Sequence, residues 1–213
     1  MVMQHSVEDV NWGGSDQPTQ EELRLSGGLQ VEDWAHARHV MHLSTQLFQA
    51  TRPLHHYGKY VLSLLERGSF LHNTGMTIES RRHHKHSYRL IKQTPIPDFS
   101  EKERHEIACI ARYHRRALPS IEHEEYAVLS GTARKRVSTM AALLRVADAL
   151  DYHHDGRVLD LVAVPELCNS KVWTLRLTTR SLADLDDELE RAHDKADLFE
   201  RVFDRKLHFI THE

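Results

Sequence analysis

The hydrophobic pattern changes its period near residue 155, and this change limits the fold more than any other feature of the sequence. Between residues 31 and 154, apolar side chains recur at spacings of three and four, as at Val31, Trp34, Leu43 and Leu47. This spacing predicts amphipathic helices. After Gly156 two segments alternate apolar and polar residues at period two, which predicts strands. We therefore expect a mainly α fold, a helical bundle followed by a small C-terminal α+β cap.

The predicted elements divide the chain as follows. Five segments have the helical period: 31–51, 55–75, 84–93, 100–118 and 132–154. The fourth begins with Ser100 three residues before Glu103, the spacing of a capping box at a helix start. The C-terminal region is predicted to contain two strands, an acidic amphipathic helix and a closing strand, at 157–166, 171–179, 184–203 and 206–210.

Three parts follow from these elements. Residues 1–30 form an N-terminal leader that we expect to be partly disordered apart from a short helical turn, because residues 1–22 contain five acids and no Lys or Arg. Residues 31–155 form the helical bundle. Residues 156–213 form the small C-terminal α+β cap.

Composition excludes several classes of protein. Of the 213 residues, 40% are hydrophobic and 28% charged, which is typical of a globular domain. No apolar run approaches the roughly 20 residues needed to cross a bilayer, and no secretory signal is visible. The two cysteines, Cys109 and Cys168, are typical of reduced thiols in a cytoplasmic protein. The net charge of −3 does not favour a nucleic-acid partner. Together these features lead us to expect a cytoplasmic protein with no membrane association.

Histidine is concentrated in the predicted bundle. Of 18 histidines, 14 lie between His36 and His154. Histidine binds transition metals and titrates near neutral pH, so this enrichment favours a metal or acid–base site. The candidates come from several separate predicted helices or their ends: His36, the doublet His72-Asn73, the adjacent His83 and His84, His114 and Asp148. Imidazole nitrogens and carboxylate oxygens converging from several bundle helices can bind a divalent metal.

Charge is unevenly distributed. Residues 81–116 hold ten Lys or Arg against four acids, and residues 184–204 hold nine acids against three bases. The first segment is a candidate anion-binding face, with a solvated basic surface as the alternative. The acidic segment is interpreted as a solvated face.

The segments that contain these residues resemble the HD superfamily of metal-dependent phosphohydrolases, whose pattern is H…HD…D. They are most similar to the C-terminal helical domain of the exopolyphosphatase / guanosine pentaphosphate phosphohydrolase (Ppx/GppA) family. The resemblance covers about residues 30–210 and is carried by HARHVMHLSTQLF, LLERGSFLHNTGMTI, RRHHKHSYRLI, PIPDFSEKERHEIACIARYHRR and LLRVADALDYHHDGRV. It implies an HD-type helical bundle and leaves a homodimer open.

The resemblance also implies roles for individual residues. His36, His72 and Asp148 match the ligands of a first divalent metal, which would be Mn, Fe, Zn or Mg. His83 or His84, together with His114, matches the position of a second metal in relatives with extra histidines. Three cations stand beside these ligands and would contact phosphate oxygens: Lys85, Arg112 and Arg115. Asp151 is expected at a helix end or behind a ligand.

Two departures from the family pattern affect function. Full-length members hold their phosphatase site in actin-like ATPase-fold domains ahead of this region, and this chain contains none. The HD doublet reads His72-Asn73, and an amide offers one neutral carbonyl oxygen where the usual Asp offers a charged one. We therefore expect weaker metal binding at Asn73.

Two functions remain open from the sequence. The first is a stand-alone HD-type phosphohydrolase that acts on a phosphoester or phosphoanhydride, such as a nucleotide, a guanosine polyphosphate or polyphosphate. The alternative is a catalytically weakened HD module that binds polyphosphate or a nucleotide, or that docks on a separate phosphatase partner. In both, the expected partner is a phosphate-containing small molecule or polyphosphate.

Overall fold

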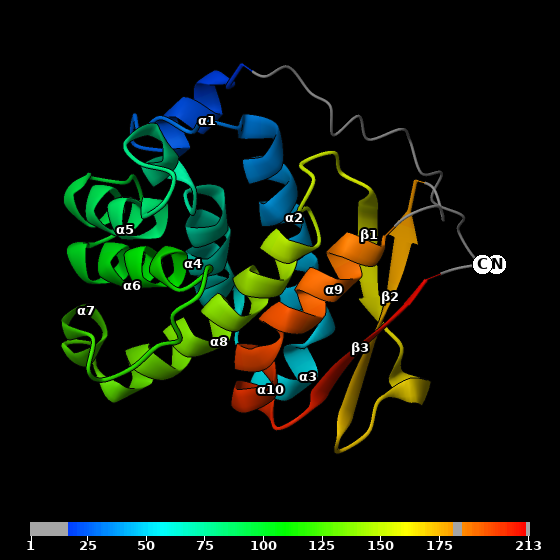
Figure 1. Cartoon of the computed structure of the whole chain (residues 1–213). Helices are drawn as coiled ribbons and strands as arrows, with labels where there is room; N and C mark the ends of the chain where they lie inside the picture. Colours follow the sequence, from blue (N-terminus) through cyan, green and yellow to red (C-terminus); the bar gives the residue numbers. More distant parts are fainter. Residues whose placement is uncertain (1–16, 181–184, 212–213) are drawn as a thin grey trace.

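The computed structural model describes residues 17–180 and 185–211 and consists mainly of helices, with a three-stranded sheet formed by the C-terminal part of the chain (Figure 1). The elements are α1 (Gln20–Leu25), α2 (Trp34–Ala50), α3 (Arg52–His55), α4 (Lys59–Phe70), η1 (Thr74–Thr77), α5 (His83–Gln93), α6 (Glu101–Arg112), α7 (Glu124–Ala127), α8 (Gly131–Ala149), β1 (Val158–Ala163), η2 (Pro165–Leu167), β2 (Val172–Thr179), α9 (Asp186–Lys195), α10 (Asp197–Phe203) and β3 (Lys206–Thr211).

The longest helix, α8, passes through the middle of the core. Twelve of its 19 residues are buried, so it is apolar around most of its circumference, as a core helix must be. It packs against α2, α4 and α6 of the bundle and against α9 and α10 of the C-terminal part (Figure 1). Ser130 caps its start by accepting a hydrogen bond from the Ala133 N–H. The side chains of α8 therefore lie between the helical bundle and the C-terminal part.

The sheet has the order β1-β2-β3. β1 and β2 are antiparallel, whereas β2 and β3 are parallel. A parallel pair needs a crossover connection, and α9 and α10 lie in the connection between β2 and β3. Both helices pack on α8, and β1 packs on α2. The C-terminal part is thus attached to the bundle along its helices and its first strand.

The elements agree with the sequence expectations, with local differences. The three strands are confirmed, as is the mainly α character. The helix expected over 184–203 is two helices separated at Ala196, and residue 184 lies outside the described residues. The helix expected over 55–75 begins at Lys59, because Gly58 ahead of it is extended with ψ −172°.

The leader also contains regular structure. Helix α1 is longer than a single turn, and a capping box formed by Thr19 and Glu22 starts it. Arg38 of α2 forms an ion pair with Glu22 and so attaches α1 to the bundle. The rest of the expected disordered leader, residues 1–16, lies outside the described residues. Within residues 17–180 and 185–211, no helix is both long and apolar enough to span a bilayer.

Gly75 allows two backbone segments to approach each other closely. It lies after α4, where the chain passes the start of α5, and its N–H donates to the Ser87 hydroxyl at 2.9 Å. A Cβ atom at Gly75 would overlap the carbonyl oxygen of His83 and lie 2.5 Å from the Ser87 backbone nitrogen. Both contacts are with backbone atoms, so no side-chain rotation could relieve this overlap. The lack of a side chain at Gly75 therefore allows His83 to lie close to the turn that carries His72.

We expect Gly75→Ala to lower the free energy of unfolding by about 2–3 kcal/mol, since the added methyl group forces two backbone segments apart. Gly131→Ala is the matched control, because a Cβ there meets nothing within 4 Å. Urea denaturation of both variants measures the difference. Equal unfolding midpoints for the two variants would show that the close approach at Gly75 does not contribute to stability.

Candidate functional site

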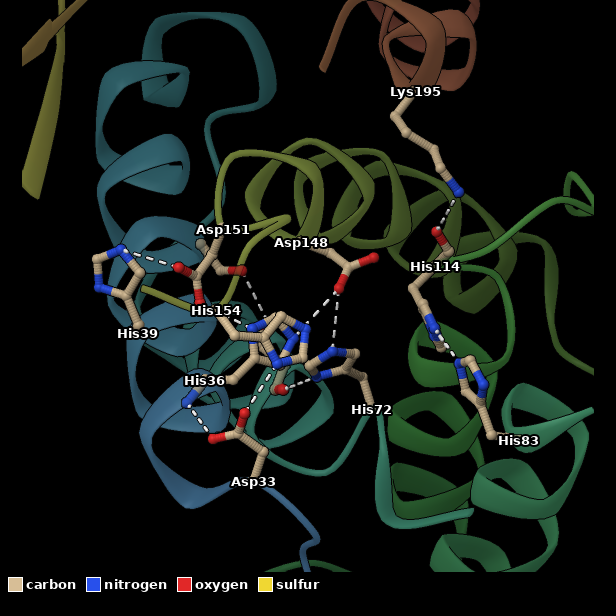
Figure 2. Close-up of polar contacts among 12 residues, drawn as sticks. Asp33, His36, His39, His72, His83, His114, Asp148, Asp151, His154 and Lys195 are labelled. Carbon is tan, nitrogen blue, oxygen red and sulfur yellow. Dashed lines mark hydrogen bonds and ion pairs between the residues drawn. The ribbon is translucent and has the colours of Figure 1, made fainter. Parts of the chain in front are cut away.

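Two histidines and one aspartate converge between α2, α4 and α8. His36 lies in the first turn of α2, His72 follows α4, and Asp148 lies in the last turn of α8. One potential ligand atom of each lies within 4.8 Å of the other two. The Oδ1 atom of Asp148 is 3.2 Å from His72 Nε2 and 3.5 Å from His36 Nε2 (Figure 2). The sequence prediction that these three residues belong together is thus matched by their positions.

Hydrogen bonds on the far side of each ring fix the orientation of both histidines. His36 Nδ1 donates to the Asp151 carboxylate at 2.7 Å, and His72 Nδ1 donates to the Ser69 carbonyl at 2.5 Å. Carbonyl and carboxylate oxygens accept only, so in each neutral ring Nδ1 carries the proton and Nε2 the lone pair. Both rings are almost fully buried. Their Nε2 atoms face Asp148, and each is an acceptor only when its ring is neutral.

His83 and His114 repeat this arrangement. His83 Nδ1 donates to the Ser80 carbonyl at 2.8 Å, and His114 Nδ1 donates to the Ala111 carbonyl at 2.6 Å. Their Nε2 atoms face each other at 2.9 Å. Two neutral rings held in this way direct two lone pairs at one another, which is favourable only when a proton or a cation lies between them.

The two groups form one continuous histidine centre, which we define as His36, His72, His83, His114 and Asp148. The ring centroids of His36 and His72 are 5.2 Å apart, and those of His72 and His114 are 5.0 Å apart. His83 and His114 stack with centroids 5.0 Å apart. Figure 2 shows these side chains directed towards one another from α2, α8 and the ends of α4, α5 and α6.

Charge is localised at the His36 end of the centre. Burial alone would lower the pKa of His36, but the carboxylates of Asp148 and Asp151 outweigh it and raise the pKa to about 9. Burial alone would raise the pKa of Asp148, but its interactions with His36 and His72 hold the pKa well below the usual range. At neutral pH this end therefore holds the Asp148 carboxylate beside a protonated His36, and a metal ion would have to displace the Nε2 proton of His36.

The other end of the centre is uncharged. Burial lowers the pKa of His114 well below its usual range. Burial and the nearby charge of Arg115 lower the pKa of His83. A neutral imidazole keeps the lone pair that a metal ion requires.

His84 and Asn73 occupy different environments from the residues of the centre. The sequence left open whether His83 or His84 pairs with His114. The structure shows the ring of His83 facing His114, whereas the ring of His84 stands edge-on to that of His83. Burial and the charge of Arg112 lower the pKa of His84 to about 4. The Oδ1 atom of Asn73 is buried, and no hydrogen-bond partner for it is found among the described residues.

The three cations expected to bind phosphate do not form one continuous face. Lys85 and Arg112 line a hollow of about 380 Å³. Arg112 is buried and donates from Nε to Glu125 at 3.1 Å. Arg115 instead donates to the backbone carbonyl of Arg81. The charge of Arg112 is therefore partly neutralised, whereas Arg115 acts on His83 of the histidine centre.

Two cations from other elements hold the turn that carries His114. Arg145 of α8, which is 2% exposed, donates to the carbonyls of Tyr113 and Arg115 at 3.2 and 2.8 Å and pairs with Asp197 at 2.7 Å. Lys195 of α9 donates to the carbonyls of His114 and Arg115. We call Arg145 and Lys195 the carbonyl clamp. Burial lowers the pKa of Lys195 to about 8.

The sequence profile of the Ppx/GppA phosphatase family, domain III, matches residues 24–193, which is most of the chain. The chain belongs to this family. A guanosine-5'-triphosphate,3'-diphosphate pyrophosphatase of Vibrio cholerae is 36% identical over 99 residues, which are 46% of this chain and 19% of the relative. A protein of the same name from Pseudoalteromonas translucida is 31% identical over 103 residues, 48% of this chain and 20% of the relative. The matched region spans about a fifth of the length of these relatives.

The sequence of this Ppx/GppA family member did not predict the carbonyl clamp. Arg145 looks like any charged residue in a helix, and only its apolar neighbours Leu144 and Val146 indicate that it is buried. Lys195 lies in the acidic segment interpreted as a solvated face. The sequence did predict a place for Asp151 at a helix end or behind a ligand, because it follows Asp148 by three residues at the end of the longest predicted helix.

We expect Arg145→Met to lower the free energy of unfolding by about 2–4 kcal/mol, because it removes hydrogen bonds from two backbone carbonyls and the partner of Asp197. Arg201→Met is the control, since Arg201 lies exposed on α10. Thermal and urea unfolding of both variants provide the comparison. A stability of the Arg145 variant equal to that of the control would exclude a stabilising role for the clamp.

Proposed function

We propose that this chain binds a divalent metal at the histidine centre and hydrolyses a phosphoester or phosphoanhydride. The observation that carries the proposal is the convergence of acceptors. Two imidazole Nε2 atoms and one carboxylate oxygen lie within 4.8 Å of one another, and each ring is held with its proton on the far side. When His36 is neutral, three acceptors converge here and repel one another unless a cation lies between them. A metal ion would supply that cation after displacing the proton that the raised pKa of His36 keeps on Nε2.

The donor set fits a transition-metal ion. Two nitrogens and one carboxylate oxygen suit Mn²⁺, Fe²⁺ or Zn²⁺ better than Mg²⁺, which prefers oxygen ligands. Three protein ligands leave coordination positions for water and substrate, as in catalytic sites. Asp151 would position His36 through its hydrogen bond to Nδ1, which is the usual support for a metal-binding histidine. His83 and His114 would supply two nitrogens to a second ion.

A bound ion would supply a water of lowered pKa and would polarise a phosphate oxygen. The residues of the chain would orient the substrate. Arg115 is the best placed of the three predicted phosphate-binding cations, because its charge already acts on His83. Lys85 and Arg112 would bind phosphates further from the histidine centre. The attraction of Arg112 for phosphate would be reduced by its ion pair with Glu125. This division favours a substrate with several phosphates.

The substrate class is proposed on two grounds. The order His36, His72 and Asp148 matches the HD superfamily pattern, apart from Asn73 in the doublet. The relatives that match part of the chain are named guanosine-5'-triphosphate,3'-diphosphate pyrophosphatases. We therefore propose a guanosine polyphosphate, another nucleotide or polyphosphate as substrate.

The second candidate function is an HD-type module that binds the same ligands without turning them over. The observation that favours it is Asn73, whose neutral amide stands where the HD pattern has a carboxylate. A missing charge weakens the attraction for a divalent ion, most of all for a pair of ions that a carboxylate would bridge.

We expect His36→Ala, His72→Ala and Asp148→Ala each to weaken the binding of Zn²⁺ or Mn²⁺ by about tenfold or more, because each removes one ligand. His193→Ala is the control, since His193 is exposed on α9. Metal titration by calorimetry and the metal content of the purified proteins are the measurements. Equal affinity in all four variants would contradict a metal at the histidine centre.

We expect Asn73→Asp to bind the metal more tightly and to release phosphate faster from guanosine tetraphosphate or polyphosphate, since it adds a charged oxygen. Without metal, the free energy of unfolding should fall by about 1–3 kcal/mol, because a charge replaces a buried amide. With metal this loss should reverse, because an ion that binds only the folded state stabilises it.

Asn169→Asp makes the same chemical change in an exposed turn and should alter neither property. If the Asn73 variant folds but gains neither metal nor turnover, the binding module is the correct function. If the unaltered chain already releases phosphate rapidly with a metal, the module is excluded.

A further inference from the structure

A second hollow, of about 590 Å³, lies apart from the histidine centre. Its walls come from α3 and the turn after it, α7, the first half of α8, and α10. Figure 1 shows α3, α7 and α10 around the lower, N-terminal part of α8. Thr139 in this hollow and Asp148 in the centre are separated by about 14 Å along the helix axis. No residue of the histidine centre lines the hollow.

One wall of the hollow carries two positive charges. Arg134 and Lys135 of α8 line it, with the hydroxyls of Ser138 and Thr139 one helical turn further on. No Asp or Glu is among the described residues that line the hollow. The next cation on the helix, Arg136, is instead held by Glu106 at 2.6 Å. The described residues that line the hollow therefore carry a net positive charge.

The opposite walls are aromatic and uncharged. Tyr57, Tyr126 and Phe203 contribute rings. His55 is held neutral, because Nε2 donates to the Phe48 carbonyl at 3.0 Å and Nδ1 accepts from the Tyr57 N–H at 2.9 Å. The His55 ring stacks on Tyr57 with centroids 5.4 Å apart, so it extends the aromatic wall without adding charge.

The Tyr126 ring is fixed in place by its hydroxyl. That group donates to the Arg134 carbonyl at 3.0 Å and is 2.7 Å from the Ser138 hydroxyl. The aromatic wall and the cationic helix are thus joined by hydrogen bonds. A pocket built from such fixed groups is preorganised, so less side-chain entropy is lost when a ligand binds.

We propose that this hollow binds a mononucleotide, with the base against the aromatic wall and the phosphate on Arg134 and Lys135. The volume lies within the range of small-molecule sites. Unstacked bases bind on tyrosine and histidine rings, and a guanidinium forms paired hydrogen bonds with a phosphate. A plain anion would use only the cations, and a neutral aromatic compound only the rings. The site is independent of the proposed hydrolysis.

Calorimetric titration of the full chain with AMP and with GMP tests this proposal. Ribose 5-phosphate and adenosine serve as the two halves of the ligand. We expect at least one mononucleotide to bind about tenfold or more tightly than either half. Arg134→Gln combined with Lys135→Gln should weaken its binding by about tenfold or more. Tyr57→Leu should weaken it separately through the aromatic wall.

Two controls separate this site from surface charge and from the histidine centre. Lys59→Gln combined with Lys102→Gln removes the same charge from exposed positions outside the hollow and should leave binding unchanged. His72→Ala should also leave it unchanged. The proposal is overturned if neither mononucleotide binds, if ribose 5-phosphate binds as tightly as the mononucleotide, if the Arg134/Lys135 variant binds normally, or if His72→Ala abolishes binding.

Discussion

Burying an imidazole ring is costly unless its N–H group has an acceptor, and this requirement organises the centre of the structure. His36, His72, His83 and His114 all meet it in the same way, with Nδ1 directed to a carbonyl or carboxylate oxygen. Once that hydrogen bond is made, Nε2 points inward, and it is an acceptor whenever the ring is neutral. The hydrogen bonds that folding requires are therefore the same contacts that would orient these rings towards the proposed metal ion.

Long-range contacts complete this arrangement. Asp151 lies beyond α8 yet holds His36 of α2, and Gly75 lets the chain segments that carry His72 and His83 approach each other. The proposed nucleotide hollow depends on the other end of α8. One buried helix thus carries an acidic residue at one end and two cations that line a hollow at the other, so its two ends attract ligand groups of opposite charge.

The sequence predicted the elements because they depend on local periodicity. The resemblance to the HD pattern singled out His36, His72 and Asp148, which the structure brings together, and their role as metal ligands stays a prediction. Apolar spacing located the helices, and His36, His72 and Asp148 fell on separate ones. The sequence could not predict the separation at Ala196, the parallel pairing of β3 or the partner of Arg145, because each depends on contacts between distant elements. The choice between His83 and His84 likewise needed the rotation of α5 about its axis.

The carbonyl clamp has an evolutionary consequence. His114 is presented by a turn whose carbonyls are bound by Arg145 of α8 and Lys195 of α9, and Arg145 in turn pairs with Asp197 at the start of α10. A substitution in α9 or α10 can therefore displace His114 through the backbone of its turn. In diverging copies of this domain, the C-terminal helices are consequently not free to drift as a mere cover, and compensating changes there should accompany any that move the histidines.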